Sequence, residues 1–483
     1  MKPIFILLFL ISSAVFAQTA PKPYGALPSK RQLAWHDLEV YGLIHFTPTT
    51  FENKEWGFGD ADPKTFNPTD FNAEQIIQAA KAGGLKGVIL VAKHHDGFAL
   101  WPTKTTDYNI SKSPFRNGKG NLVKEVEQAA RKNGLKFGVY CSPWDRNNPL
   151  YGTNKYLSVY QAQLKELYSE YGELFMSWHD GANGGDGYYG GAKEKRSIDN
   201  TTYYDWTNTW GITRKMQPMA NIFSDIGLDI RWVGNEDGHA AETSWATFTP
   251  MAPDGKNVAV PGQANYPQSP GGIRNGKFWM PAECDVPLRK GWFYHETEEP
   301  KTPEMLFDLY LKSVGRGAGL DLGLAPDTRG QLHDDDVAAL KAFGSMVKNT
   351  FSNSLAKGST ISSSHSRGKK FNPALALDGN KQTYWATADE THTANLEIDL
   401  KTPKSFDIIS LQEYIPLGQR IEAYTIEVLE NNNWKKIYDG TSIGAKRLIK
   451  LDQPVTTNKV KFNITKSPVC ITLSEIGLYK KSL

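Results

Sequence analysis

AAKAGGLKGVILV at residues 79–91 nearly repeats as AARKNGLKFGVY at residues 129–140, and this pair decides the fold of the first two thirds of the chain. In each stretch a helix ends at a glycine and an apolar strand begins almost at once. A third instance follows, in which an apolar helical face over residues 156–171 stops at Gly172 before the apolar run 174–178. Helices that alternate with short apolar strands indicate parallel βα units.

The alternation extends over residues 35–345, and a span of about 310 residues suits a (β/α)8-type barrel with long loops. A doubly wound open sheet is the alternative, but no glycine-rich phosphate loop follows the first strand. A late helix is predicted to begin at residues 302–304, with Thr302 as its cap, Pro303 in its first position and Glu304 in its first turn. We therefore predict an α/β fold with a catalytic (β/α)8-like barrel over residues 25–347.

The sequence changes character after about Lys348. Ser and Asn cluster over residues 349–366, and short runs of alternating apolar and polar residues follow, separated by turn residues such as Asn431–Asn433. This pattern is typical of a sandwich of antiparallel strands. We predict that residues 348–483 form an all-β sandwich domain.

Composition excludes some classes of protein. The 483 residues carry 55 Lys and Arg against 52 Asp and Glu, a net charge of +3, and this near-neutrality argues against a nucleic-acid partner. A hydrophobic content of 40% with 22% charged residues fits a globular protein. The three cysteines, Cys141, Cys284 and Cys470, are too few for a disulfide framework.

The first residues read as a targeting segment. A basic Lys2 precedes the apolar run 4–11, and Val15 and Ala17 stand where a signal peptidase reads small or short side chains. A membrane anchor is the alternative, but the run falls short of the roughly 20 apolar residues that span a bilayer. We predict a signal peptide over residues 1–17, no membrane span, and a protein exported to a periplasm or the cell exterior.

In a β/α barrel the reactive groups lie at the carboxyl ends of the strands, so we examined the residue that follows each apolar run. Three histidines, several tryptophans and several carboxylates follow such runs. They include His45, His94, His95, Trp144, Asp145, Asp180, Glu236, Glu283 and Asp285. The strand assigned to residues 278–282 places Glu283 and Asp285 on this rim as well.

Three kinds of catalytic chemistry are candidates for these residues. A histidine metal site is disfavoured, because His94 and His95 would point to opposite sides if both kept strand geometry. A serine nucleophile needs a tight turn such as Gly-x-Ser-x-Gly, which the sequence lacks. A pair of carboxylates with aromatic platforms remains, and glycoside hydrolysis requires that arrangement.

At these residues the chain resembles the α-L-fucosidases of glycoside hydrolase family 29. The resemblance covers about residues 30–347, and the set of motifs is specific although each one alone is weak. The matching segments are residues 42–46, 92–98, 178–181, 232–236, 291–294 and 319–326.

The resemblance implies a retaining mechanism through a covalent fucosyl–enzyme, with Asp180 as nucleophile and Glu236 as acid/base. Glu242 and Glu283 remain rivals for the second role. It further implies that His45, His94 and His95 hold sugar hydroxyls, that Trp56, Tyr140 and Trp178 line the ring, and that Trp292 packs the sugar methyl. No cofactor is expected for catalysis.

Finer specificity is also implied by resemblance. Residues 232–236 look more like the branch of the family that is selective for α-1,3/4-linked fucose on branched glycans. The loop over residues 253–277, rich in Gly, Pro and Asn, is then a candidate for binding the rest of the substrate. The alternative interpretation is that this loop is a surface insertion without a function.

The C-terminal region resembles a discoidin-type (coagulation factor type C) sandwich, with residues 376–385 as its opening and residues 474–477 as its close. That fold implies a candidate carbohydrate-binding module, or a support for the barrel. It also implies that Asp378 and Glu475 help to hold a structural calcium, since a hard cation prefers oxygen ligands.

We therefore expect a fucosylated oligosaccharide or glycoconjugate as the substrate. Two other hypotheses stay open, a non-catalytic fucose-binding protein like a lectin and a metal-dependent barrel hydrolase. The sequence indicates no oligomeric state.

Overall fold

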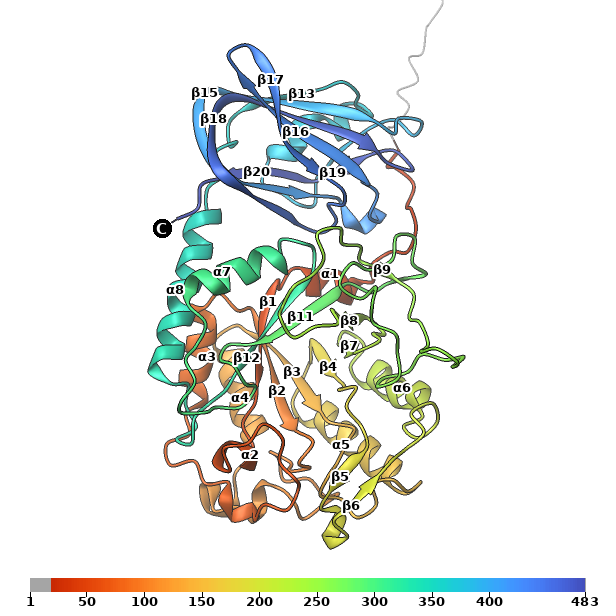
Figure 1. Ribbon diagram of the computed structural model, residues 1–483, viewed down its shortest axis with the longest axis vertical. Coiled ribbons are helices and arrows are strands. Elements are labelled where there is room, and N and C mark those ends of the chain that lie inside the picture. The colour runs from red at the N-terminus through yellow and green to blue at the C-terminus, as the bar shows by residue number, and fades with distance from the viewer. Residues whose placement is uncertain (1–18, 483) are drawn as a thin grey trace, which may run out of the picture.

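The structure is a computed structural model that describes residues 19–482, so the predicted signal peptide at residues 1–17 lies outside the described residues. A barrel with its helices forms one part of the molecule and a β-sandwich packs against one end of it (Figure 1). Over residues 19–482 no helix combines the length and the apolar character needed to cross a membrane.

Eight parallel strands close the barrel, which confirms the predicted fold class. Their order around the barrel is β1-β12-β11-β8-β7-β4-β3-β2. They run over Val40–Ile44 (β1), Gly87–Lys93 (β2), Lys136–Cys141 (β3), Met176–Trp178 (β4), Asn221–Ser224 (β7), Ile230–Trp232 (β8), Ala282–Pro287 (β11) and Gly319–Leu324 (β12).

Helices surround most of the barrel. They are α1 (Lys30–His36), α2 (Pro48–Phe51), α3 (Ala73–Ala82), α4 (Leu122–Lys132), α5 (Tyr156–Glu170), α6 (Trp206–Met216), α7 (Pro303–Lys312) and α8 (Asp334–Phe351). In the described chain no helix separates β7 from β8 or β8 from β11. A short connection over residues 225–229 joins β7 to β8, and the long segment over residues 233–281 joins β8 to β11.

The near-repeat of the sequence folds as predicted. Asn72 and Asn121 cap α3 and α4 with their side chains, and each helix ends just before a glycine with positive φ, Gly84 at 81° and Gly134 at 77°. The strands β2 and β3 begin within three residues of those glycines and pair with each other. At the late helix, Thr302 caps α7 as predicted.

One predicted strand is wrong. Residues 278–282 do not form a barrel strand, because Phe278–Trp279 (β10) pairs antiparallel with Thr247–Phe248 (β9) outside the barrel. Pro281 has no N–H to donate to a ladder, and the barrel strand β11 begins only after it. Glu283 and Asp285 therefore lie within β11 rather than beyond its end.

The second domain has the predicted antiparallel sheets. Its main sheet contains β13 (Thr360–Ser363), β15 (Ala394–Gln412), β18 (Arg447–Lys466), β16 (Ala423–Glu430) and β17 (Asn433–Gly440), and β20 (Glu475–Tyr479) also pairs with β15. A small sheet joins β14 (Trp385–Ala386) to β19 (Thr472–Leu473), and a hairpin on the barrel joins β5 (Gly185–Gly187) to β6 (Glu194–Arg196).

Separate hydrophobic cores support the two domains. One lies between the barrel strands and their helices, a second fills the barrel interior, and a third fills the sandwich. Short 3-10 helices complete the chain at residues 63–65, 110–112, 115–118, 189–191, 369–371, 373–377 and 415–417.

Candidate active site

A cavity of about 340 Å³ opens at the carboxyl ends of the barrel strands. All nine residues that we predicted for catalysis and sugar binding line it. They are His45, Trp56, His94, His95, Tyr140, Trp178, Asp180, Glu236 and Trp292. The structure thus brings together side chains that are up to 247 residues apart in the sequence, from His45 to Trp292.

Asp180 lies two residues beyond β4 with its side chain partly accessible from the cavity. The Tyr140 hydroxyl donates to Oδ2 at 2.9 Å, and the Ala182 amide donates to Oδ1 at 2.6 Å. Asp180 therefore caps the turn that follows it and also faces the cavity. Two donors fix both oxygens in the orientation that a carboxylate nucleophile needs.

Gly181 is required by the next strand end. A Cβ at this position would lie 2.4 Å from Asp225 Oδ2, closer than any side chain can approach. This close approach joins the end of β4 to the end of β7. It places Asp225, which the sequence analysis did not single out, beside Asp180.

The three predicted histidines are buried and meet at the cavity wall. His94 and His95 leave strand geometry, because β2 ends at Lys93, and their ring centroids lie 4.2 Å apart. The expectation that they point to opposite sides therefore does not apply. Burial lowers the pKa of His45 to about 3 and lowers those of His94 and His95, so the rings are neutral at pH 7.

Neutral rings suit the recognition of hydroxyl groups. The Ser142 hydroxyl donates to Trp144 O at 2.8 Å, so its oxygen accepts from His95 Nδ1 at 2.7 Å. His95 Nε2 is left as an acceptor and lies 3.8 Å from Asp180 Oδ2. The Nδ1 atoms of His45 and His94 are buried and make no hydrogen bond within the described residues.

Glu236 lies on the exposed loop after β8. Partial burial raises the pKa of its carboxyl, and so do the negative charges of Asp180, Glu55 and Asp237, while a hydrogen bond with Trp292 acts in the opposite direction. A carboxyl that keeps its proton to higher pH can donate that proton. Asp180 and Glu236 thus share one cavity in different surroundings.

The two rivals of Glu236 lie elsewhere. Glu242 points away from the cavity and forms ion pairs with Arg316 and Arg447. Glu283 is fully buried inside the barrel, where it accepts hydrogen bonds from the Tyr41 hydroxyl and, at 2.7 Å, from Trp178 Nε1. Neither side chain lines the cavity.

Aromatic rings form the walls. Trp178 stacks between Tyr140, at a centroid distance of 4.8 Å, and Phe223, at 4.2 Å. Trp292 is held by its backbone amide, which donates to Glu55 Oε2 at 2.9 Å. Trp56 is 51% exposed at the mouth of the cavity, so it does not belong to the core.

Sequence reasoning missed several lining residues, including Asp225 and Tyr266, whereas Asp285, which it had placed on the rim, also lines the cavity. Asp225 directly follows β7, in which only Ile222 and Phe223 are apolar, so the signal for this strand end in the sequence is weak. It accepts hydrogen bonds from the Tyr266 hydroxyl and, at 2.8 Å, from the Gly262 amide. These contacts bring the loop over residues 253–277 to the cavity, and no pattern in the sequence pointed to Tyr266.

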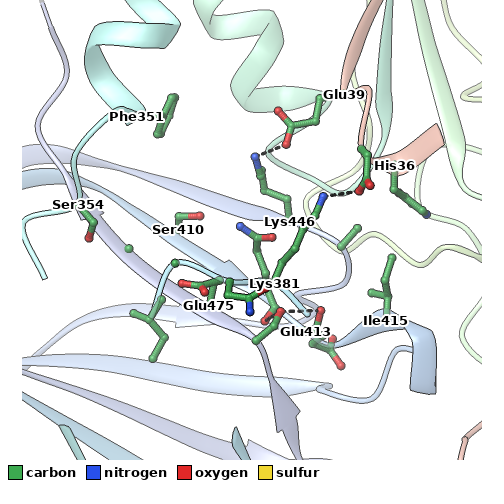
Figure 2. A pocket seen from close by; sticks show the side chains of 18 of the residues that line it. His36, Glu39, Phe351, Ser354, Lys381, Ser410, Glu413, Ile415, Lys446 and Glu475 are labelled. Atoms are coloured by element: carbon green, nitrogen blue, oxygen red, sulfur yellow. Dashed lines mark hydrogen bonds and ion pairs between the residues drawn. The ribbon is translucent and has the colours of Figure 1, made fainter. Parts of the chain in front are cut away.

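A larger cavity, of about 850 Å³, lies between the two domains (Figure 2). Lys446 forms an ion pair with Glu39 across it, and Lys381 forms one with Asp37. Neither Asp180 nor Glu236 faces this cavity, so the smaller one is the candidate active site.

Asp378 and Glu475, the predicted calcium ligands, both line the larger cavity. The Thr383 hydroxyl donates to Asp378 Oδ2 at 2.7 Å, and Glu475 Oε1 is buried without a hydrogen-bond partner among the described residues. Over residues 19–482 no group of three or more His, Cys, Asp or Glu side chains is arranged to hold a metal ion. A cation here would rest on these two carboxylates and on neutral oxygens.

The barrel brings two carboxyls and neutral hydrogen-bonding rings to one cavity at the ends of its strands, and this arrangement is typical of glycoside hydrolases. The comparisons with known proteins sharpen that class. The family model "Alpha-L-fucosidase" matches residues 26–350, and the model "F5/8 type C domain" matches residues 359–476.

Curated and solved relatives agree. Alpha-L-fucosidase 1 of Arabidopsis thaliana is 38% identical over 97% of this chain and 90% of its own length. A fucosidase of glycoside hydrolase family 29 from Ruminococcus gnavus, solved in complex with fucose, superposes with a TM-score of 0.84 at 29% identity, over 96% of this chain and 97% of the other. A member of that family from an unknown rumen bacterium gives 0.83 at 36% identity, over 96% and 78%. This chain belongs to the α-L-fucosidases of glycoside hydrolase family 29 and carries a C-terminal F5/8 type C domain.

Proposed function

We propose that this protein is an exported, retaining α-L-fucosidase that removes terminal α-linked fucose, with a preference for α-1,3/4 linkages on branched glycans. The observation that carries the proposal is the pair Asp180 and Glu236. Both line one cavity, one with its oxygens held by two donors and the other with a raised pKa.

The reaction takes two displacements. Asp180 attacks the anomeric carbon while Glu236 gives its proton to the leaving oxygen, so a covalent fucosyl ester forms as the glycosidic bond breaks. Glu236, now ionised, then takes a proton from a water molecule, and that water displaces Asp180. Each displacement inverts the anomeric carbon, so two of them retain its configuration.

The walls support fucose as the sugar in the cavity. The neutral rings of His45, His94 and His95 offer donors and acceptors to hydroxyl groups. The half-buried indole of Trp292 offers an apolar surface to the methyl group that fucose carries in place of a 6-hydroxyl. A polar hydroxymethyl group at that surface would lose hydration without gaining a partner.

Replacement of the nucleophile tests this assignment. Asp180→Asn should lower fucose release by about 10³-fold or more, because the amide cannot form the ester intermediate. Asp186→Asn, an exposed change in the neighbouring hairpin, is the matched control and should leave release unchanged. Turnover by Asp180→Asn within tenfold of the parent would refute the role, and a parent that binds fucosylated glycans without releasing fucose would favour the lectin-like hypothesis.

Linkage preference is tested on the same preparation. We expect a higher kcat/KM on trisaccharides with fucose in an α-1,3 or α-1,4 branch than on an α-1,2-linked trisaccharide. The loop over residues 253–277 supports this, since Asp225 anchors it at the mouth of the cavity through Gly262 and Tyr266. An equal or higher kcat/KM on the α-1,2 substrate would contradict the preference.

Export rests on the sequence of residues 1–17. Expression of the full chain should yield a mature protein that starts after Ala17 and is recovered outside the cytoplasm. Mass spectrometry of the recovered N-terminus checks this. A cytoplasmic protein with its N-terminal segment intact would contradict it.

We also propose that Asp378 and Glu475 hold a structural calcium in the second domain. Burial, and then the charge of Asp378, raises the pKa of Glu475 to about 7, and a cation would relieve both effects. Calcium should raise the thermal unfolding temperature of the parent but not that of Asp378→Asn, measured after removal of metals with a chelator. Equal unfolding temperatures with and without calcium would contradict the site, and loss of fucose release in chelator would favour the metal-dependent hydrolase.

A further inference from the structure

The second domain meets the barrel at several places, and one of them is the short stretch of residues 242–246, which we name the docking segment. Gln419 of the sandwich accepts from the Ala246 amide at 2.9 Å and donates to Ser244 O at 3.0 Å. The Ser442 hydroxyl accepts from the Ser244 amide at 2.8 Å. The sandwich thus satisfies backbone groups of the segment much as a neighbouring strand would.

A buried arginine strengthens this contact. Arg447, whose side chain is 3% exposed, donates to Glu242 O at 2.7 Å and pairs with the Glu242 carboxylate. The Tyr438 hydroxyl donates to the same carboxylate at 2.8 Å, and Arg316 of the barrel reaches it from the other side at 2.9 Å. A buried guanidinium that lost these partners would pay a desolvation cost, so the pairing is specific.

The docking segment is continuous with the loop that carries Glu236, only six residues upstream (242 − 236). Asn235, just before Glu236, folds the loop on itself, accepting from the His239 amide at 3.3 Å and donating to His239 O at 3.0 Å. The Ala240 amide then donates to Lys312 O at 3.0 Å. No helix or strand of the described chain holds residues 233–246, so the path of the loop depends on these contacts, on those of the sandwich, and on the amides of Ala241 and Trp245, which donate to Pro270 O at 2.9 Å and Gly271 O at 2.8 Å.

We propose that the F5/8 type C domain positions the acid/base, by holding the docking segment through Gln419, Ser442 and Arg447 and thereby the loop that presents Glu236. The proposal rests on the proposed role of Glu236 as proton donor. The sequence left open whether this domain binds sugar or supports the barrel. In this proposal the domain supports the barrel at the loop that carries the acid/base. Gln419, Ser442 and Arg447 are positioning residues, because they act through the loop and touch no substrate.

Proton donation requires that the position of Glu236 be fixed closely. A general acid must come within about 2.6–3.2 Å of the oxygen that it protonates, and a displacement of about 1 Å can cost 10²-fold in rate. Asp180, in contrast, follows a barrel strand and is held by Tyr140 and Ala182. A loosened sandwich contact should therefore impair proton donation and leave nucleophilic attack intact.

The experiment separates these two effects by the leaving group. The substrates are 4-nitrophenyl and unsubstituted phenyl α-L-fucosides, which have aglycones of similar size. Nitrophenolate leaves with little help from an acid, whereas phenolate needs a proton. The variants are Ser442→Ala and Gln419→Leu in the full chain, with Glu236→Gln as the reference for lost acid catalysis.

Lys381→Ala is the matched control. It removes a different contact between the same two domains, the ion pair with Asp37, which does not touch the loop. Thermal unfolding of each variant shows whether the fold is retained. Ser442→Ala deletes a single hydroxyl and is the variant least able to disturb folding.

The expected result is a loss of kcat/KM on the phenyl fucoside that exceeds the loss on the nitrophenyl fucoside by about fivefold or more, in the direction shown by Glu236→Gln and absent from Lys381→Ala. Equal losses on both substrates in folded Ser442→Ala and Gln419→Leu, or no loss on either, would overturn the proposal. A parent inactive on both substrates would instead refute the proposed function. If Glu236→Gln itself showed no such dependence, the assignment of the acid/base would be the part that fails.

Discussion

Single residues in the cavity gain their roles from their surroundings. Asp180 and Glu236 carry the same functional group, yet hydrogen-bond donors hold both oxygens of the first, while partial burial and neighbouring negative charges keep the second protonated to higher pH. The proposed retaining hydrolysis needs one carboxylate that attacks the sugar and one carboxyl that donates a proton.

The pH profile of kcat/KM should report the raised pKa of Glu236. Activity needs the protonated form, so it should fall as pH rises through that pKa. Asp237→Asn removes one of the charges that raise it, and we expect the upper limb to move down by roughly a few tenths of a pH unit, with the lower limb unchanged. An upper limb that stays in place or moves up would contradict this account.

The residues of the cavity were predictable where a strand end presents them and unpredictable where a loop does. His45, Asp180 and Glu236 follow apolar runs, so their place on the rim could be read from the sequence. Tyr266 arrives on a loop whose path depends on contacts with Asp225, and local sequence does not encode such contacts.

The strands of the barrel could likewise be predicted only where the signal lies in neighbouring residues. The repeat around β2 and β3 was clear because helix, glycine and strand follow each other at short range. β7 was missed because only two apolar residues, Ile222 and Phe223, stand in it between polar ones. Residues 278–282 were wrongly predicted as a barrel strand because an apolar run looks alike in a hairpin and in a barrel strand. Glu283 consequently lies inside β11, where it supports the wall of the cavity.

Variants of Glu283 test how β11 supports the wall of the cavity. Its carboxyl accepts from Trp178 Nε1 at 2.7 Å, and Trp178 stacks on Tyr140, which in turn donates to Asp180. Glu283→Gln keeps an acceptor for the indole and should lower kcat/KM by less than about tenfold. Glu283→Ala leaves the indole N–H of Trp178 and the O–H of Tyr41 buried without an acceptor, although Trp35 Nε1 still donates to the Tyr41 oxygen, and should destabilise the fold by about 2–5 kcal/mol.

Urea denaturation of both Glu283 variants measures this difference. The expected order of stability is parent, then Glu283→Gln, then Glu283→Ala. An alanine variant as stable as the glutamine variant would show that the buried carboxyl does not hold the wall.

The whole molecule should be most stable in weakly acidic solution. Burial raises the pKa of Glu283 and of Glu413 to about 7, so the stability that these carboxyls contribute is present at low pH and is lost as pH rises through 7. Burial lowers the pKa of His36, His45 and His179 to about 3, so the unfolded chain takes up protons below about pH 6.5 and stability falls there.

Burial also raises the pKa of the carboxyls of Asp96, Asp225, Asp285, Asp321 and Glu475, which strengthens the first trend, so the two trends together predict that the free energy of unfolding is highest below pH 7. Urea denaturation of the full chain between pH 5 and 8 measures it. A free energy that still rises from pH 7 to 8 would contradict the assignment of neutral buried carboxyls.

The central claim is that Asp180 becomes covalently bonded to the sugar, and trapping of that intermediate tests it most directly. A 2-deoxy-2-fluoro-fucosyl fluoride should react once, because the fluorine slows the second displacement, and the intact protein should gain the mass of one fluorofucosyl group. Peptide mapping should place that group on Asp180, with no adduct in Asp180→Asn. An adduct on another residue, or rapid turnover of other fucosides with no trapped adduct and an inverted product, would contradict the account.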